Sequence, residues 1–307
     1  MNFPYTIFER VSDFFFKPDD RDAGFLPFFR TAVALACLIH FCAVWRDFLD
    51  LYGSNGVVPA DLVGLLKPSW IPSFKQLAGG AEAMLTVSEA LTAIIFKVLY
   101  VVVCLVLIRG WMVPISAGLL LFLHLVLTKG APLYAYGIDS FKTIALFYCI
   151  TFSVGNRFIV GATPFRRILQ LHLCIVYFFS GFEKLLGYNW HNGEAVWKAL
   201  HLPYMKTAIS QHVEKLGDYP LVFIVAGWAV IFIEMAYPVF MNLSKTRTFW
   251  LVAAVLLHLG IAVSLGLYFF SAMMIILNLS AFANLQRLSG DLLTIRRRPL
   301  EPAHQSP

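Results

Sequence analysis

The chain has 307 residues, of which 59% are hydrophobic and 14% are charged, and its mean hydropathy is +0.72. A soluble domain has about 45–50% apolar and about 25% charged residues, so this composition excludes an ordinary soluble globule. The net charge of +6 comes from basic residues scattered between apolar segments, which indicates membrane topology and not a nucleic-acid partner. Long apolar runs predict that the protein spans the bilayer with helices.

The first 24 residues predict a short helix that lies in the membrane interface. Apolar residues recur there at helical spacing, with charged residues between them: Phe3, Ile7, Phe8, Val11, Phe14 and Phe15. No small-residue cleavage site follows this segment. We therefore expect no removable signal peptide, and we expect the first span to act as its own insertion signal.

Eight apolar segments follow, and together they predict an all-α, polytopic bundle of about eight transmembrane helices. The predicted spans are 25–45, 84–108, 111–128, 139–155, 166–187, 220–242, 247–265 and 267–285. We divide the chain into an interfacial segment at 1–24, a transmembrane domain at 25–287 and an unstructured tail at 288–307. Two long connections, 46–83 and 188–219, are rich in aromatic residues and are expected to be functional.

The distribution of Lys and Arg predicts the orientation. Fourteen of these residues fall on one side of the predicted spans, seven fall on the other side, and three lie within spans. Because the richer side faces the cytoplasm, we expect both termini inside and both long connections outside. The predicted location is the plasma membrane, in a bacterial cell the inner membrane.

Ionisable side chains within the predicted spans are the candidates for function, because a charge at the bilayer centre costs from about 2.5 to over 10 kcal/mol. They are His40, Glu89, Lys97, His124, Asp139, Lys142, His172, Glu183, Lys184, Glu234 and His258. Structural roles are the simpler interpretation for Glu89 and Lys97, for the lone histidines, and for Asp139 and Lys142, which are spaced to pair locally. The sequence has no HExxH or CxxC pair, so we expect no metal site.

Glu183 and Lys184 stand together near the outer end of the fifth predicted span. Adjacent helical residues point about 100° apart, so we expect one of the two to enter the bundle interior. A lysine buried there is a possible general base or nucleophile, whereas a lysine that reaches the membrane edge is only an anchor. Glu234 lies mid-span, four residues before Pro238, where it either marks a site or makes an interhelical hydrogen bond.

The same stretch carries a resemblance to a known family. The segment VYFFSGFEKLLGYNWHNG is similar to a motif Val-Tyr-Phe-Ile-Ala-Gly-Val-Lys-Lys-Leu that is followed by Asp-Trp and Gly. The matching residues are Tyr177, Phe178, Gly181, Lys184, Leu185, Trp190 and Gly193. This motif belongs to the horizontally transferred transmembrane domain family, which includes the vitamin K-dependent gamma-glutamyl carboxylase.

Two further segments extend the resemblance over residues 18 to 285. PDDRDAGFLPFFRTAVAL is similar to the family's opening segment, with Phe29-Arg30 at the start of the first span. The last spans are similar to the family's closing pattern at His258, Gly266, Phe269, Ser271 and Met274.

The resemblance implies an enzyme whose base is Lys184, by its place in the motif, acting on a reduced quinone or on a secreted peptide. In that interpretation Glu234 and His258 support the base, and Glu183, Tyr177, Trp190 and Tyr136 contact the substrate. Both long connections are expected to cap the cavity. The cofactor is not fixed by the sequence, and a reduced quinone is the candidate.

Two departures keep a non-enzymatic alternative open. The carboxylase has Asn-Asn-His before a Tyr-x-Tyr-Gly segment, whereas this chain has Gly130-Ala131-Pro132-Leu133 before Tyr134-Ala135-Tyr136-Gly137. We also expect no large lumenal region of the kind that would bind a protein substrate. In the alternative, the bundle binds a lipid or a partner peptide. A secreted peptide or a separately encoded soluble protein is the candidate partner. A transporter is disfavoured because the sequence lacks paired broken helices and internal symmetry.

Overall fold

The computed structural model describes residues 6–19, 22, 24–59, 70–156, 158–159, 161–202, 207 and 215–284. Regular structure in these ranges is entirely helical. Seven helices are long and apolar enough to cross a membrane: α2 (Phe25–Ala43), α6 (Glu89–Arg109), α7 (Val113–Gly130), α8 (Gly137–Gly155), α9 (Thr163–Leu186), α13 (Pro220–Phe240) and α14 (Arg247–Leu265). The predicted all-α, polytopic membrane bundle is confirmed.

The eighth predicted span is a shorter apolar helix, α15 (Tyr268–Phe282), which has 15 residues. At 1.5 Å per residue it is about 22 Å long, less than the hydrocarbon thickness of a bilayer, about 30 Å. It follows α14 through a tight turn at Gly266, whose φ of 71° favours glycine. Most of its residues from Ser271 onward are buried, so α15 is a core helix.

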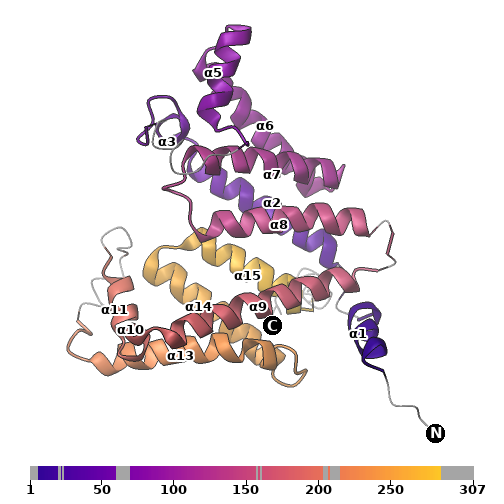
Figure 1. Cartoon of the computed structure of the whole chain (residues 1–307), viewed down its shortest axis with the longest axis vertical. Helices are drawn as coiled ribbons and strands as arrows, with labels where there is room; N and C mark the ends of the chain where they lie inside the picture. The colour runs from indigo at the N-terminus through magenta and orange to yellow at the C-terminus, as the bar shows by residue number, and fades with distance from the viewer. Residues whose placement is uncertain are drawn as a thin grey trace, which may run out of the picture.

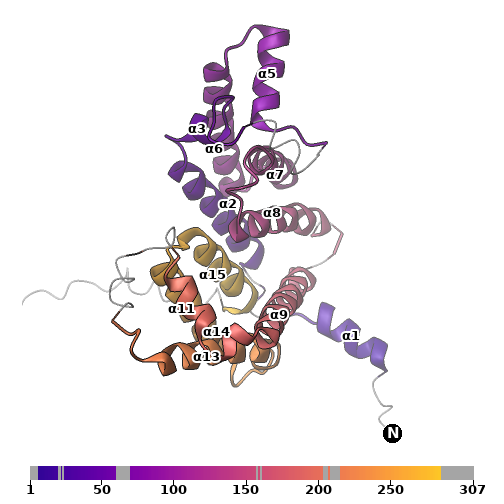
Figure 2. The same ribbon diagram turned by 60° about the vertical axis from the view of Figure 1, so that its left-hand side comes forward.

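The helices form two groups that meet at α15. In Figure 1, α6 and α7 lie towards one end of the molecule and α13 and α14 towards the other, with α2, α8 and α15 between them. Helix α2 packs on α6, α8 and α15, while α9 packs on α13 and α15. Figure 2, turned by 60°, shows the same order. Because α15 contacts α2, α8, α9 and α14, it joins the two groups.

The N-terminal segment forms the amphipathic helix α1 (Ile7–Phe16), as predicted. Thr6 and Glu9 make a capping box at its start, and none of its residues is buried. Figure 1 shows α1 beside the beginning of α9, where the Arg167 guanidinium lies 5.0 Å from the Phe14 ring. Its position in the membrane interface stays a prediction, and the predicted tail at 288–307 lies outside the described residues.

Both long connections contain short helices. The first holds α3 (Phe48–Tyr52) and α5 (Phe74–Leu85), and the second holds α10 (Tyr188–His191) and α11 (Glu194–Leu200). The second transmembrane helix therefore starts later than the predicted residue 84. Thr86 has a φ of 54°, which ends α5, and the side chain of Ser88 accepts from the Leu91 amide to begin α6.

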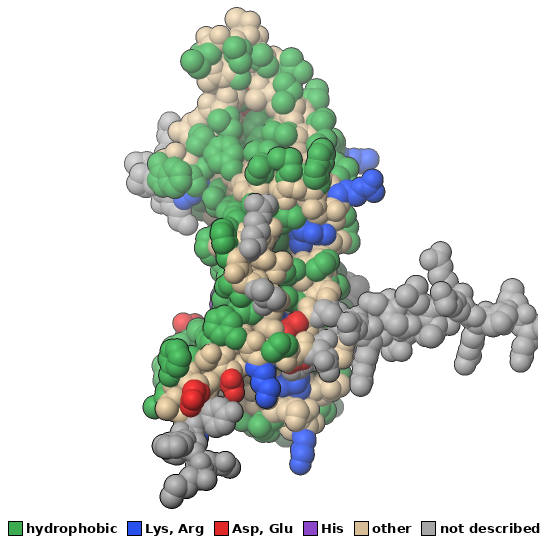
Figure 3. Space-filling view, turned by 90° about the vertical axis from the view of Figure 1, so that its right-hand side faces the viewer, with side chains coloured by type: hydrophobic (Ala, Val, Ile, Leu, Met, Phe, Trp, Pro, Cys, Tyr) green, Lys and Arg blue, Asp and Glu red, His purple; other side chains and the backbone are tan. Residues whose placement is uncertain are grey.

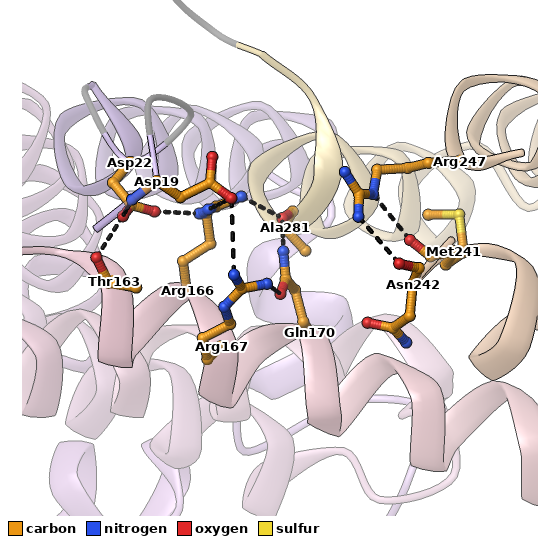
Figure 4. A network of polar contacts seen from close by, with 10 residues as sticks. All are labelled: Asp19, Asp22, Thr163, Arg166, Arg167, Gln170, Met241, Asn242, Arg247 and Ala281. Atoms are coloured by element: carbon orange, nitrogen blue, oxygen red, sulfur yellow. Dashed lines mark hydrogen bonds and ion pairs between the residues drawn. The ribbon is translucent and has the colours of Figure 1, made fainter. Parts of the chain in front are cut away.

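A polar network ties the segment before α2 to the bundle (Figure 4). The fully buried Arg166 of α9 forms ion pairs with Asp19, at 3.0 Å, and with Asp22, and it donates to the Ala281 carbonyl of α15 at 3.4 Å. Thr163 also donates to Asp22. One arginine thus joins three parts of the chain at the α8–α9 end of the bundle.

Candidate functional site

A large cavity lies where α9, α13, α14 and α15 converge at the end of the bundle opposite the α8–α9 connection. Its volume is about 650 Å³, within the range of about 300–1,000 Å³ that is typical of small-molecule sites. Apolar side chains form most of the wall, including Val176, Val230 and Leu256. Residues of α11, among them Val196 and Leu200, close one side, so the 188–219 connection caps the cavity as predicted.

The wall of this cavity carries an ion pair between two helices. The Lys184 ammonium of α9 lies 2.7 Å from the Glu234 carboxylate of α13, and the two side chains are 19% and 10% exposed. Lys184 also donates to Ser180 Oγ at 2.6 Å and, more weakly, to the Ser180 carbonyl at 3.4 Å. Its ammonium lies 5.3 Å from the centre of the Trp190 ring, which adds a cation–π contact.

Gly181 brings the two charged residues together. A Cβ at this position would lie 2.9 Å from Glu234 Cβ and 2.9 Å from the Met235 amide nitrogen. Contacts of that length are too close for any side chain, so α9 and α13 approach as they do only because this residue is glycine. Pro238 lies one turn after Glu234 and has no backbone N–H. The helical hydrogen bond that the Glu234 carbonyl would otherwise accept from position 238 is therefore missing.

A second polar chain reaches the cavity at His258. Tyr237 donates to Asn278 Oδ1 at 2.7 Å, and Asn278 Nδ2 donates to the Tyr177 hydroxyl at 2.8 Å. The same hydroxyl lies 2.6 Å from His258 Nε2, so Tyr177 joins Asn278 to His258. His258 Nδ1 is buried and has no hydrogen-bond partner among the described residues. The His258 side chain lines the cavity.

Four other ionisable residues meet in a smaller cavity of about 180 Å³ between α2, α3, α7 and α8. Asp139 pairs with Lys142 at 2.9 Å, which confirms the predicted local pair. Lys142 also donates to His40 Nδ1 at 2.7 Å, and His124 Nε2 donates to the Asp139 carbonyl at 3.1 Å. Burial raises the pKa of Tyr52, outside the spans, to about 12, so its hydroxyl in this cavity stays protonated.

The predicted site residues separate into two places. Lys184, Glu234, His258, Tyr177 and Trp190 all line the large cavity. Tyr136 instead lines the small cavity. Glu183 is exposed, because the 100° step between neighbours that turns Lys184 inward turns Glu183 outward.

Some of the predicted site lies away from the cavity that holds Lys184. Glu183 and Tyr136 do not line this cavity, and their contact with a substrate stays a prediction. The described residues of the 46–83 connection do not line it either, and Leu51 and Tyr52 line the small cavity instead. The physical reason is an aromatic cluster in which Phe48 contacts Phe74 and Phe96, which fixes α3 against α6.

The remaining ionisable residues have structural contacts. Glu89 accepts from the Ser54 amide at 2.6 Å, and Lys97 donates to the Trp45 carbonyl at 3.1 Å. His172 bonds the Tyr148 hydroxyl at 2.8 Å. Within the described ranges, no three His, Cys, Asp or Glu side chains are placed to hold a metal ion.

Sequence reasoning missed Ser180 and Asn278. Ser180 had a usable signal, because it lies one helical turn before Lys184 and therefore on the same face. Asn278 is a polar residue inside the apolar eighth span and has the same kind of signal. Its role in connecting Tyr237 to Tyr177 depends on packing between α9, α13 and α15, which the sequence does not show.

Comparison with known proteins identifies no relative of this chain. The chain matches no protein-family model, no curated protein and no solved structure. The resemblance to the horizontally transferred transmembrane domain family therefore stays a prediction that depends on the motif around Lys184. What is shown is a multi-pass integral membrane protein with an apolar cavity that contains a lysine–glutamate pair.

Proposed function

We propose that the large cavity binds an apolar molecule with an oxygen-bearing head, such as a reduced quinone, and that Lys184 exchanges a proton with that head. The observation that carries the proposal is the Lys184–Glu234 pair in the wall of a 650 Å³ cavity whose lining is otherwise mostly apolar. Ligand sites commonly combine such a wall with a few convergent polar groups. His258 is a further polar side chain that lines the same cavity.

The proton transfer proposed for this site balances within the pair. Moving one proton from the Lys184 ammonium to the Glu234 carboxylate gives a neutral amine and a carboxylic acid. The amine then accepts a proton from the hydroxyl of a bound quinol, and the ammonium and a quinol anion result. Ser180 and Trp190 hold Lys184 in place during this exchange, as they do in the ion pair.

A quinol-like ligand fits the lining better than an extended peptide. A peptide would bring a backbone donor and acceptor with each residue, and each buried group needs a partner. The polar groups of the cavity are concentrated around Lys184, Glu234 and His258, while α11 and α14 contribute mainly aliphatic side chains. A ligand with one polar head and an apolar body therefore matches the lining of this cavity.

We expect Lys184→Ala to weaken binding of 2-methyl-1,4-naphthoquinol to the purified chain by at least about tenfold. The reason is the loss of one charge-assisted hydrogen bond, typically about 1.5–3 kcal/mol. Binding is measured by anaerobic titration in detergent. Lys97→Ala is the matched control, because Lys97 lies in a membrane helix and does not line the cavity. No binding by the wild type, or equal binding by both variants, would refute the proposal.

A second candidate is binding without chemistry, and a specific observation favours it. Lys184 already has acceptors for its three protons: Glu234, Ser180 Oγ and the Ser180 carbonyl. Lys184→Arg separates the two candidates, because arginine keeps the charge but does not deprotonate in proteins. If Lys184→Arg retains the ligand and forms no quinol anion, whereas the wild type does, proton exchange is supported. If the wild type also forms no anion, the site only binds.

A further inference from the structure

Arg30, at the start of α2, has no hydrogen-bond or ion-pair partner among the residues that the structure describes. None of its N–H groups makes a hydrogen bond or an ion pair with a residue that the structure describes, and its Nε is buried. Arg166, Arg167 and Arg247, towards the same end of the bundle, all have acceptors (Figure 4). An arginine is always charged in proteins, so Arg30 needs a counter-ion from outside the described chain.

A cavity of about 270 Å³ lies beside this guanidinium, and its lining combines polar and apolar parts. Ser153 and Asn156, from the end of α8, bring a hydroxyl and an amide, and neither side chain bonds a described residue. Leu26 and Val113 add an apolar part. Neither Asp nor Glu occurs among the described residues that line it, so the site carries a net positive charge.

The backbone around the cavity is arranged to leave room for the guanidinium. A Cβ at Gly110 would overlap with the Arg30 guanidinium, so the side chain lies against bare backbone at the α6–α7 turn. Gly110 has a φ of 78°, which also favours glycine. Helix α7 begins close by, at Val113, without a side-chain cap, and the start of a helix carries partial positive charge.

We propose that Arg30, with Ser153 and Asn156, binds the phosphate of an anionic phospholipid at this end of the bundle. The planar fork of arginine matches phosphate oxygens, and the lipid headgroup region supplies phosphate at the ends of membrane helices. Figure 3 shows this end of the molecule: Asp and Glu side chains are visible only in the lower half, away from α6 and α7. The apolar residues beside Arg30 favour a lipid over a free anion, because they accommodate the glycerol and the first acyl carbons.

Native mass spectrometry of the full chain with phosphatidylglycerol tests this site. We expect Arg30→Gln to weaken binding of one phosphatidylglycerol by at least about tenfold, the equivalent of one charge-assisted hydrogen bond. Arg109→Gln is the matched control, since Arg109 is exposed, one residue before Gly110, and does not line the cavity. Phosphatidylcholine, whose headgroup is neutral overall, should bind the wild type more weakly.

A second variant tests the site without touching the charge. Ser153→Ala with Asn156→Ala should also weaken phosphatidylglycerol binding, while the chain keeps its elution volume and helix content. Equal lipid binding by the wild type and by all variants would overturn the proposal. Displacement of the lipid by inorganic phosphate at equal concentration would also overturn it, because the site would then bind a free anion.

Discussion

Arg166→Met should destabilise the protein strongly, and by more than a substitution of Lys184. It removes the nearest counter-ion of Asp19 and Asp22, whose side chains are only 16% and 12% exposed, and leaves Asp19 the longer ion pair with Arg167 at 3.6 Å. Removing one partner of a buried pair typically costs about 3–5 kcal/mol of unfolding free energy. We therefore expect a loss of that order, measured by SDS titration of the folded chain in mixed micelles.

The control for this prediction is Arg109→Met, at the exposed C-terminal end of α6. Surface substitutions usually change stability by less than about 0.5 kcal/mol. Arg166→Lys should lie between the two, because lysine keeps the charge but not the fork that reaches both carboxylates. If Arg166→Met and Arg109→Met have the same stability, the network of Figure 4 does not fix the N-terminal segment to the bundle.

Lys184→Met should also be strongly destabilising, and a second substitution should reverse much of the effect. The single change leaves the Glu234 carboxylate, 10% exposed, in an apolar wall without its partner. We expect a loss of about 2–4 kcal/mol, somewhat less than for a fully buried pair. In Lys184→Met with Glu234→Leu no charge remains, and stability should return to within about 1 kcal/mol of the wild type.

The same SDS titration is applied to the wild type, Lys184→Met, Glu234→Leu and the double variant. Together these four proteins form a double-mutant cycle, which gives the interaction energy of the pair. A double variant that is less stable than Lys184→Met alone would show that the two side chains do not act as a pair. This double-mutant cycle measures the free energy of unfolding and not ligand binding. A double variant that is stable and no longer binds quinol therefore agrees with the stability prediction and with the binding prediction for Lys184→Ala.

The sequence predicted the helices of this fold well, because apolar runs long enough to cross a bilayer leave little choice of structure. The predicted start of α6, at residue 84, was wrong. Met84 and Leu85 are apolar and lengthen the apolar run in the sequence, but the helix begins only after its N-cap residue Ser88. The short length of α15 was also not visible. Its apolar residues continue to Phe282, and only the tertiary contacts show that it is a core helix between two groups.

The candidate site was predictable in its residues and not in its contacts. Lys184 was identified from its position near a helix end and from the motif around it, and the 100° rule correctly required that one of Glu183 and Lys184 turn inward. The pairing of Lys184 with Glu234, 50 residues apart, depends on the close approach at Gly181. Lys142 and His40 are 102 residues apart, and no local pattern joins them.

The two cavities share an aromatic partition. The ring centre of Phe269 lies 4.6 Å from that of His40, which lines the small cavity. The ring centre of its neighbour Phe270 lies 5.9 Å from that of His258, which lines the large cavity. The rings of Phe141, on α8, and Phe270 also pack together, with their centres 5.9 Å apart. The start of α15 thus separates two clusters of ionisable residues, which explains why Tyr136 and Lys184 belong to different sites.

Filling the large cavity tests the central claim most directly. Val230 lines the cavity one turn before Glu234, whereas Val225, on the same helix, is 59% exposed. Binding of 2-methyl-1,4-naphthoquinol is titrated for Val230→Trp and, as the matched control, for Val225→Trp. If the cavity is the ligand site, the first variant loses binding by at least about tenfold, or about 1.4 kcal/mol, and the second binds like the wild type. Equal binding by two folded variants would contradict the account.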